Sequence, residues 1–462
     1  MNSEQYREFG KRMIDYSANY LDTLRSREVY PNVKPGYLKE LIPDSAPVDP
    51  EPFENILEDV ERVIMPGVTH WHHPNFYAYF PTGNSYPCIL ADILSDTLGV
   101  IGFSWASSPA CTELEIVMMD WLAKVIGLPE HFLSSSDSGG GGVIHSTASE
   151  ATLFTMFVAR DIKGGSDTNV RKMVAYGSKL AHSSVERACL LGAVQYTSVA
   201  YDHNYSMRGH DLEESIQKDI EKGLIPFCVV ATLGTTSCCS FDNLKEIGEV
   251  CQKFDLWLHV DAAYAGSAFI CEETRHHMSG IELADSFNFN PHKWLLIQFD
   301  CSAVWIKDKI KLANAFRVDP LYLQHENQSQ AVDFRHWQIP LGRRFRSLKL
   351  WFTFRTFGVN AFQKHIRTSI QMADYFANLV TSNDNFELFR PQSMGLVCFR
   401  AKGSNDQNKE LLARLNGTRE VHLTPSEIDE TYFLRLAICS TQTTYKDLDK
   451  AFELILKHFK DL

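Results

Sequence analysis

The sequence predicts a three-layer α/β fold in which helices flank a mainly parallel sheet. Between about residues 90 and 320, short apolar strands alternate with helical segments. The clearest unit runs from the apolar stretch 227–232 through a helical segment at 244–254 to a second apolar stretch at 256–260. Strand, helix and strand within about 35 residues predict a parallel βαβ unit. Because these strands are apolar along their whole length, we expect them to be buried on both faces.

The first 85 residues predict a helical arm. Apolar side chains recur at three- and four-residue steps over 3–25 and again over 54–64, which indicates two amphipathic helices. Six prolines between residues 31 and 52 stiffen the segment that joins them. Two such helices cannot enclose a core of their own. They must therefore pack on another domain or on a second subunit. We favour the second subunit for this arm, residues 1–85, and expect a homodimer.

The rest of the chain predicts a large and a small domain. The large α/β domain would span residues 86–348. After it come a long helical stretch, strand-like runs at 396–399 and 432–437, and a terminal amphipathic helix at 446–459. These elements predict a small C-terminal α/β domain over residues 349–462.

Composition excludes several classes of protein. The 462 residues carry a net charge of −12, which disfavours nucleic acid as a partner. No apolar run reaches the ~18 residues of a membrane span, and the N-terminus shows no secretory signal. The 11 cysteines form no CxxC pair, which is typical of reduced thiols. We expect a cytoplasmic protein that binds neither nucleic acid nor membrane.

Polar residues stand at the ends of predicted strands in three places. A partly desolvated lysine such as Lys293 can attack a carbonyl carbon and form a Schiff base. Asp261 ends a buried strand, where a carboxylate needs a partner such as a pyridinium nitrogen. Glycines 139–142 lead into a helix start at 147–151, whose free N–H groups favour a phosphate. In combination, these three features predict a pyridoxal phosphate site.

Each feature alone has an ordinary explanation. An isolated lysine is usually a surface residue, and serine or threonine is common where a helix begins. No GxxxxGK[ST] pattern follows the glycines, so a nucleotide-binding loop is not supported. His70, His72 and His73 surround Trp71, but we expect packing there and no metal site.

Four longer segments carry a resemblance over nearly the whole chain. They lie at residues 65–72, 103–114, 288–293 and 335–343. With the order of the three polar features, they resemble the group II pyridoxal phosphate-dependent decarboxylases of fold-type I. The resemblance is strongest to the aromatic-L-amino-acid decarboxylases within that group.

The resemblance implies a role for each matching residue. Lys293 would hold the cofactor covalently, Asp261 would pair with its ring nitrogen, His182 would stack on its ring, and Tyr322 would protonate Cα from a mobile loop. The implied cofactor contacts are Thr147, Ala148, Ser149, His182, Thr236, Asp261, Ala263, Asn290, His292 and Lys293, with Asp242 supporting their surroundings. The implied substrate pocket consists of Trp71, Tyr79, Phe80, Pro81, Thr82, Ile101, Phe103, His182 and Gly342, with Ile101 and Phe103 serving the partner's site.

The implied reaction is decarboxylation of aromatic L-amino acids to amines and CO2, as in catecholamine and serotonin biosynthesis. L-dopa, 5-hydroxytryptophan, tyrosine and tryptophan are the candidate substrates. An aldehyde synthase is an alternative, but such relatives often replace the residues at His182 or Tyr322. Histidine decarboxylases usually carry serine at the position of Gly342. The chain departs from its relatives at His145-Ser146, where they carry Gln-Gly, and in a shorter segment at 324–332.

Overall fold

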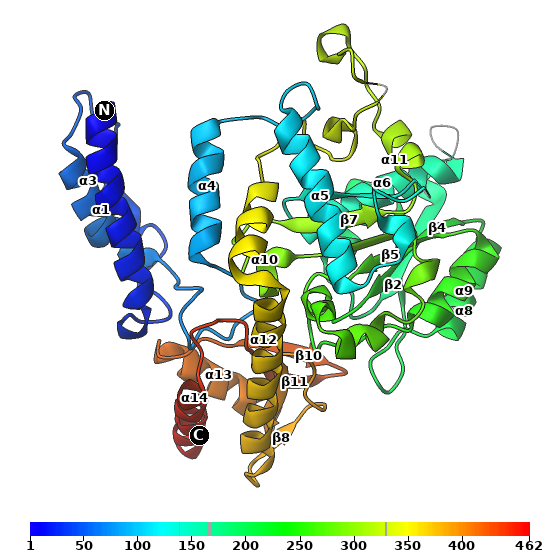
Figure 1. The fold of residues 1–462 in the computed structure, drawn as a ribbon. Helices are drawn as coiled ribbons and strands as arrows, with labels where there is room; N and C mark the ends of the chain where they lie inside the picture. Colours follow the sequence, from blue (N-terminus) through cyan, green and yellow to red (C-terminus); the bar gives the residue numbers. More distant parts are fainter. Residues whose placement is uncertain (138, 165–168, 329) are drawn as a thin grey trace. The chain divides into compact units, whose positions relative to one another are not determined.

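The computed structural model describes residues 1–137, 139–164, 169–328 and 330–462 (Figure 1). These residues form two compact units. One comprises residues 82–373 and 392–396. The other comprises residues 1–81, 374–391 and 397–462. The division into an arm and two domains, with boundaries after residues 85 and 348, stays a prediction.

A seven-stranded sheet forms the centre of the unit that contains residues 82–373. Its strands lie in the order β1-β7-β6-β5-β4-β2-β3. Strands β3, β2, β4, β5 and β6 are parallel, whereas β7 runs antiparallel to both β6 and β1. The strands are β1 (Gly141–His145), β2 (Met173–Ser178), β3 (Gln195–Val199), β4 (Ile225–Thr232), β5 (Trp257–Asp261), β6 (Ser286–Phe289) and β7 (Ser302–Ile306).

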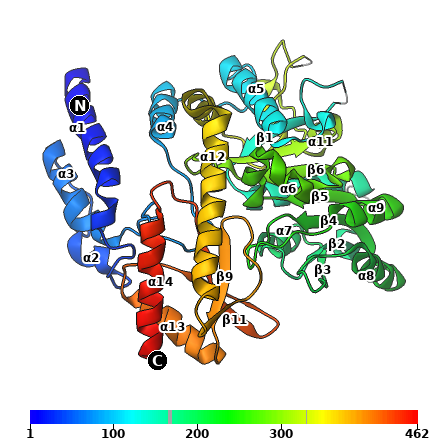
Figure 2. The same cartoon turned by 60° about the horizontal axis from the view of Figure 1, so that its bottom comes forward.

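Helices cover both faces of this sheet. The helices are α5 (Pro109–Ile126), α6 (Ala148–Gly164), α7 (Ser184–Leu191), α8 (Gly209–Glu221) and α9 (Leu244–Phe254). Connections between parallel strands are right-handed, so α6 and α7 lie on one face, and α8 and α9 lie on the other (Figure 2). The mainly parallel three-layer fold predicted from the sequence is confirmed.

The βαβ unit is the best-predicted part of the fold. β4, α9 and β5 occupy 225–232, 244–254 and 257–261, close to the predicted ranges. Every residue of β5 is buried, and so is all of β4 after Ile225. These strands are rich in valine, leucine and aromatic residues because both of their faces are covered.

The other unit contains the N-terminal helices and a four-stranded sheet of order β10-β11-β9-β8. Its strands are β8 (Phe386–Leu388), β9 (Leu396–Ala401), β10 (Thr424–Ile428) and β11 (Thr431–Ala437). Helices α13 (Asn405–Gly417) and α14 (Tyr445–Lys460) accompany this sheet. The long helix α12 (Ser347–Thr381) belongs up to residue 373 to the unit of the seven-stranded sheet and from residue 374 to this one. It is interrupted by Gly358, whose φ of 69° lies in the left-handed region that glycine tolerates.

Both predicted N-terminal helices are present. α1 (Ser3–Asp22) begins with a capping box between Asn2 and Gln5. α3 (Phe53–Asp59) continues into a π-helical turn, Val60–Ile64, and a short helix α2 (Tyr37–Leu41) lies between α1 and α3. The rings of Phe9 and Phe53 stack 4.5 Å apart and hold α1 against α3. None of the described helices is long and apolar enough to cross a membrane.

Candidate active site

Asp261 lies where three parallel strands end side by side. It is in register with Thr232 on β4 and with Asn288 on β6. Its side chain is 3% exposed, and its Oδ1 accepts a hydrogen bond from the Ala263 N–H at 2.9 Å. Oδ2 accepts no hydrogen bond from any described residue. This edge of a parallel sheet is where ligands bind in open α/β folds.

The segment after β6 brings Lys293 to the same edge. The Ala262 N–H donates to the carbonyl of Asn288 at 2.9 Å, and the Asn290 N–H donates to the carbonyl of Ala263 at 3.0 Å. Lys293 then lies in the short helix α10 (Pro291–Trp294), and its N–H donates to the carbonyl of Asn290 at 2.9 Å. Two backbone hydrogen bonds therefore hold the segment that follows β6, which leads to Lys293, against the segment that follows Asp261.

His292 is held in a neutral form beside Lys293. It is buried, and its Nδ1 accepts a hydrogen bond from the Cys301 N–H at 2.9 Å. Burial, with Lys293 close by, lowers the pKa of His292 to about 3. The ring is therefore uncharged at neutral pH. It packs beside Lys293 and accepts a hydrogen bond, but it adds no positive charge to the site.

His182 belongs to the same group of side chains. It lies in the loop between β2 and α7, and part of the residue is exposed to solvent while part is buried. Partial burial lowers the pKa of His182; the Asp261 carboxylate opposes this effect and Lys293 adds to it. Asp261 and Lys293 are therefore the charged groups that act on His182.

The start of α6 offers donors for an anion. The Glu150 N–H donates to Thr147 Oγ1 at 3.1 Å, and the Ala151 N–H donates to the Thr147 carbonyl. The N–H groups of Ala148 and Ser149 donate to none of the described residues and have no partner within the helix. Two open N–H groups at the positive end of a 17-residue helix fit a phosphate group.

The backbone of Ser146, where the resemblance implies a glycine, is not strained. Its φ is not among the positive values found in this chain. Its N–H and Oγ both donate to Glu150 Oε2, at 3.0 and 2.5 Å. Together with nearby His145, these bonds outweigh burial and lower the pKa of Glu150. Glu150 therefore stays ionised and caps the turn that precedes α6.

Thr236 and Asp242 differ in their surroundings. Thr236 is exposed in the loop after β4. Asp242 is buried, and its two carboxylate oxygens each accept a 2.8 Å bond, one from the Met207 N–H and one from the Thr232 N–H. Burial raises the pKa of Asp242 to about 7 despite these bonds. Asp242 therefore ties the loop to the end of β4.

Gly342 lies against Ile101, one of the residues predicted for the substrate. A Cβ built on Gly342 would be 3.7 Å from Ile101 Cγ2. The Gly102 N–H donates to the carbonyl of Arg343 at 3.2 Å, and the Arg335 N–H donates to the carbonyl of Phe103 at 2.8 Å. The segment 335–343 therefore runs along 101–103.

A buried ion pair fixes the segment 335–343, and sequence reasoning missed it. Arg343 bonds Glu115 of α5, and both side chains are fully buried. Glu115 Oε1 also accepts the Ile144 N–H at 2.8 Å. Glu115 is one of three acidic residues in α5, with Glu113 and Asp120, and its partner lies 228 positions away, so the sequence carries no clear signal for this pair.

The remaining predicted pocket residues fall into different units. Thr82 belongs to the unit of Lys293, and the next residue, Gly83, donates its N–H to the His292 carbonyl at 2.7 Å. The other unit contains Trp71, Tyr79, Phe80 and Pro81. There the rings of Trp71 and Tyr79 stack 5.4 Å apart. Tyr79 adopts a left-handed φ of 58°, a conformation that is often found at functional sites.

Tyr322 is largely exposed to solvent in this conformation. It is 81% exposed, in the short helix Leu321–Leu323 of the loop between α11 (Lys309–Ala315) and α12. The loop is tied at its base by Asp319, which bonds Arg317 at 2.5 Å, Arg335 at 2.9 Å and Gln328 at 3.0 Å. The tyrosine is therefore presented to solvent from an anchored loop.

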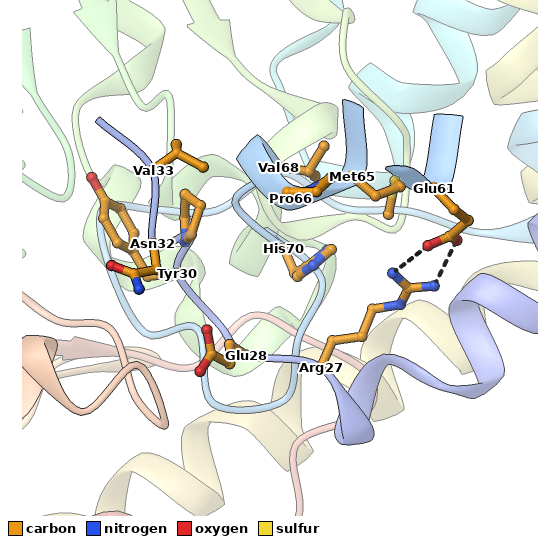
Figure 3. A pocket seen from close by; sticks show the side chains of 11 residues that line it. Arg27, Glu28, Tyr30, Asn32, Val33, Glu61, Met65, Pro66, Val68 and His70 are labelled. Carbon is orange, nitrogen blue, oxygen red and sulfur yellow. Dashed lines mark hydrogen bonds and ion pairs between the residues drawn. The ribbon is translucent and has the colours of Figure 1, made fainter. Parts of the chain in front are cut away.

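A separate pocket of about 410 Å³ lies in the N-terminal segment (Figure 3). Arg27 and Glu61 form an ion pair at 2.9 Å on its wall, and His70 Nδ1 bonds the Tyr20 hydroxyl at 2.8 Å. None of the predicted site residues lines this pocket. Within the described residues, no group of His, Cys, Asp or Glu is arranged to hold a metal ion.

The residues on this sheet edge fit pyridoxal phosphate. Open N–H groups at Ala148 and Ser149 suit its phosphate. The open Oδ2 of Asp261 suits a protonated ring nitrogen, and Lys293 suits its aldehyde carbon. These groups come from four elements that the sheet brings together: α6, β5, α10 and the loop before α7.

Comparison with known proteins agrees with this fit. Residues 35–402 match the pyridoxal-dependent decarboxylase conserved domain. The chain is 56% identical to the aromatic-L-amino-acid decarboxylase of Manduca sexta over 98% of this chain and 92% of the relative. A structure of Oryza sativa TDC with PLP and tryptamine has a TM-score of 0.97 and 36% identity, and the match covers 100% of this chain and 99% of that one. A structure of 4-hydroxyphenylacetaldehyde synthase from Rhodiola rosea has a TM-score of 0.95 and 37% identity, with the same coverage. This chain belongs to the pyridoxal-dependent decarboxylase family.

Proposed function

We propose that this protein decarboxylates aromatic L-amino acids to the corresponding amines and CO2, with pyridoxal phosphate as cofactor. The observation that carries the proposal is that Asp261 ends β5 and Lys293 follows the neighbouring strand β6, with backbone hydrogen bonds between the two segments, in a unit where α6 begins with open N–H groups. The chain is 56% identical to the aromatic-L-amino-acid decarboxylase of Manduca sexta, and this similarity supports an aromatic amino acid as the substrate.

Each residue has a distinct task in this reaction. When bound, pyridoxal phosphate supplies a ring that accepts the electron pair left behind as CO2 departs. Lys293 would hold the cofactor, and Asp261 would keep the proton on the ring nitrogen. His182 would pack on the ring face opposite Ala263. The N–H groups of Ala148 and Ser149 would bind the phosphate and fix its orientation.

Tyr322 would supply the proton that replaces CO2 on Cα. Water must be excluded from the site while this proton is transferred. The exposed loop that carries Tyr322 would therefore have to close over the substrate. The open position of Tyr322 is compatible with a loop that admits substrate first. Trp71 and Tyr79, whose rings stack, would contact the aromatic ring of the substrate. Ile101 and Phe103 would serve the site of the partner subunit.

Product analysis tests the proposal. We would incubate the pyridoxal phosphate-loaded protein with L-dopa in air and measure amine, CO2, ammonia, aldehyde and peroxide. We expect dopamine and CO2 in equal amounts without peroxide. Lys293→Ala should lose both turnover and the absorbance band of the bound cofactor. Amine formation at the normal rate by Lys293→Ala would overturn its assignment.

An aldehyde synthase is the second candidate, because the Rhodiola rosea enzyme shares the whole fold. That reaction consumes one O2 and one water for each amino acid and yields aldehyde, CO2, ammonia and hydrogen peroxide. The presence of both His182 and Tyr322 favours the simple decarboxylase. Peroxide formed in proportion to CO2 would reverse this assignment.

We further propose that the protein is a cytoplasmic homodimer in which the N-terminal arm packs on the partner. The arm exposes several apolar side chains, among them Tyr6, Met13, Ile14, Ile56 and Ile64. All 11 cysteines are buried and none forms a disulfide, which suits a reducing compartment. Light scattering at micromolar concentration should give about twice the chain mass of 52.5 kDa. The mass of a single chain would contradict the dimer.

A further inference from the structure

The helix that follows His182 is capped by the His182 ring. The N-cap residue of α7, Ser183, makes no capping hydrogen bond through its side chain. Instead, the Ser184 N–H, the first of the helix, donates to His182 Nδ1 at 3.2 Å. The Ser184 hydroxyl lies 2.9 Å from the same nitrogen. His182 therefore does for α7 what an asparagine or serine side chain usually does at a helix start.

This arrangement determines which nitrogen of the ring carries the proton. A backbone N–H can only donate, so Nδ1 must offer its lone pair, and the proton of a neutral ring is then on Nε2. A second proton on Nδ1 would break the bond to the Ser184 N–H. It would also place a positive charge at the positive end of α7.

Ser184 is well placed to enforce this state. Its side chain is only 4% exposed, so its hydroxyl has little access to water and needs a partner within the protein. It also lines a pocket of about 350 Å³ together with Ser149 and Glu150 at the start of α6. Ser184 therefore connects the ring of His182 to the region predicted for the phosphate.

We propose that Ser184 is a positioning residue that keeps His182 neutral with its proton on Nε2. In this form, Nε2–H is a hydrogen-bond donor for the cofactor or the substrate, and the ring adds no positive charge beside Lys293. The charged groups that act on His182 are Asp261 of β5 and Lys293 of α10. An imidazolium at His182 would be attracted by the Asp261 carboxylate, which the ring nitrogen of the cofactor needs. The protonation state of His182 does not depend on the proposed function, but its consequence for catalysis rests on that function.

The protonation state can be measured without turnover. We would label histidine with 15N in the full-length, cofactor-free protein and follow the ring nitrogens from pH 5 to 8.5. The His182 signals are identified by their loss in His182→Asn. In the wild type we expect an unprotonated Nδ1, a protonated Nε2 and a titration below that of an ordinary histidine. Because no substrate or cofactor is present, this result is independent of whether the proposed reaction is correct.

Ser184→Ala and Ser183→Ala form a matched pair of variants. Ser184→Ala removes one donor to Nδ1 and leaves the backbone donor. We expect the His182 titration to move up by about 0.5 to 1 pH unit, with part of the population changing to the Nδ1–H tautomer. Ser183→Ala should leave both unchanged, because the Ser183 side chain makes no cap hydrogen bond. Ser184→Thr keeps the hydroxyl and should restore the wild-type titration.

The loaded enzyme supplies a second readout. For Ser184→Ala we expect the acid limb of the kcat/KM pH profile to move up together with the His182 titration. A purely structural serine would lower thermal stability but leave both curves in place. Identical His182 ring signals and titrations in Ser184→Ala and wild type would overturn the inference, and so would an Nδ1–H tautomer in the wild type.

Discussion

Gly342 is a residue at which one added side chain should change substrate preference. Its Cβ position is 3.7 Å from Ile101 Cγ2, which is an ordinary van der Waals distance, and its φ is not positive. A serine therefore fits without strain but adds a hydroxyl beside the apolar wall proposed for the substrate ring. Burying that hydroxyl without a partner against an aromatic ring is unfavourable.

We expect Gly342→Ser to lower kcat/KM for L-dopa by roughly tenfold, mainly through KM, with a free energy of unfolding within about 0.5 kcal/mol of wild type. Gly342→Ala is the control, because it adds volume without the hydroxyl and should lose less. The measurement is steady-state kinetics with L-dopa and with L-histidine. Unchanged kcat/KM values for both substrates would remove Gly342 from the substrate pocket.

At the scale of single residues, the sequence could identify chemical groups but not their partners. Asp261 and Lys293 were predictable because charged residues at the ends of apolar strands are conspicuous. Asp242 was predicted to support the cofactor's surroundings, but the structure shows that both its oxygens are used by the backbone N–H groups of Met207 and Thr232. Ser184 was not predicted, because its importance depends on where the His182 ring points.

At the scale of elements, apolar pattern predicted β4, α9, β5 and α1 well. The spacing of apolar residues indicates which side chains are buried, and in these elements the buried side chains follow the regular spacing of a helix or a strand. The π-helical turn at Val60–Ile64 was not predictable, because it continues the same apolar spacing with a different backbone hydrogen-bond pattern. The anchoring of the Tyr322 loop was also missed, since its hydrogen bonds join residues that surround Asp319 only after folding.

In the loop between α11 and α12, the hydrogen bonds at the base can be removed by a substitution at Asp319 that leaves Tyr322 unchanged. Asp319 accepts bonds from Arg317, Gln328 and Arg335, and the Arg317 bond, with nearby positive charges, lowers the pKa of Asp319. The carboxylate is therefore ionised at neutral pH. Asp319→Asn removes the charge and at least one of the bonds, and should loosen the base of the loop that carries Tyr322.

We expect Asp319→Asn to lower kcat by roughly three- to tenfold with little change in cofactor affinity, because closure over the substrate becomes less favourable. Faster cleavage of the loop by a protease should accompany the loss. Glu326→Gln makes the same change of carboxylate to amide at an exposed position of this loop and should behave like wild type. Equal kcat and equal proteolysis in both variants would show that Asp319 does not control the loop.

At the scale of the whole molecule, buried histidines make stability depend on pH. His73, His259 and His292 are at most 5% exposed. Burial lowers the pKa of His73 and His259 to about 4 and that of His292 to about 3. Unfolding returns each to an ordinary value near 6.5. Between the two values only the unfolded chain binds the proton, so stability is complete above about pH 6.5 and is lost as the pH falls below it.

Each of these histidines should lower the free energy of unfolding by about 1.4 kcal/mol per pH unit below pH 6.5. His292→Asn tests one of them, because the asparagine Oδ1 can replace Nδ1 as acceptor for the Cys301 N–H but cannot be protonated. In urea unfolding from pH 5 to 7.5, its stability should fall less steeply with acid by about that amount. The exposed His276→Gln should keep the wild-type slope. If His292→Asn also keeps that slope, His292 titrates as an ordinary histidine in the folded protein, and acid sensitivity must come from other groups.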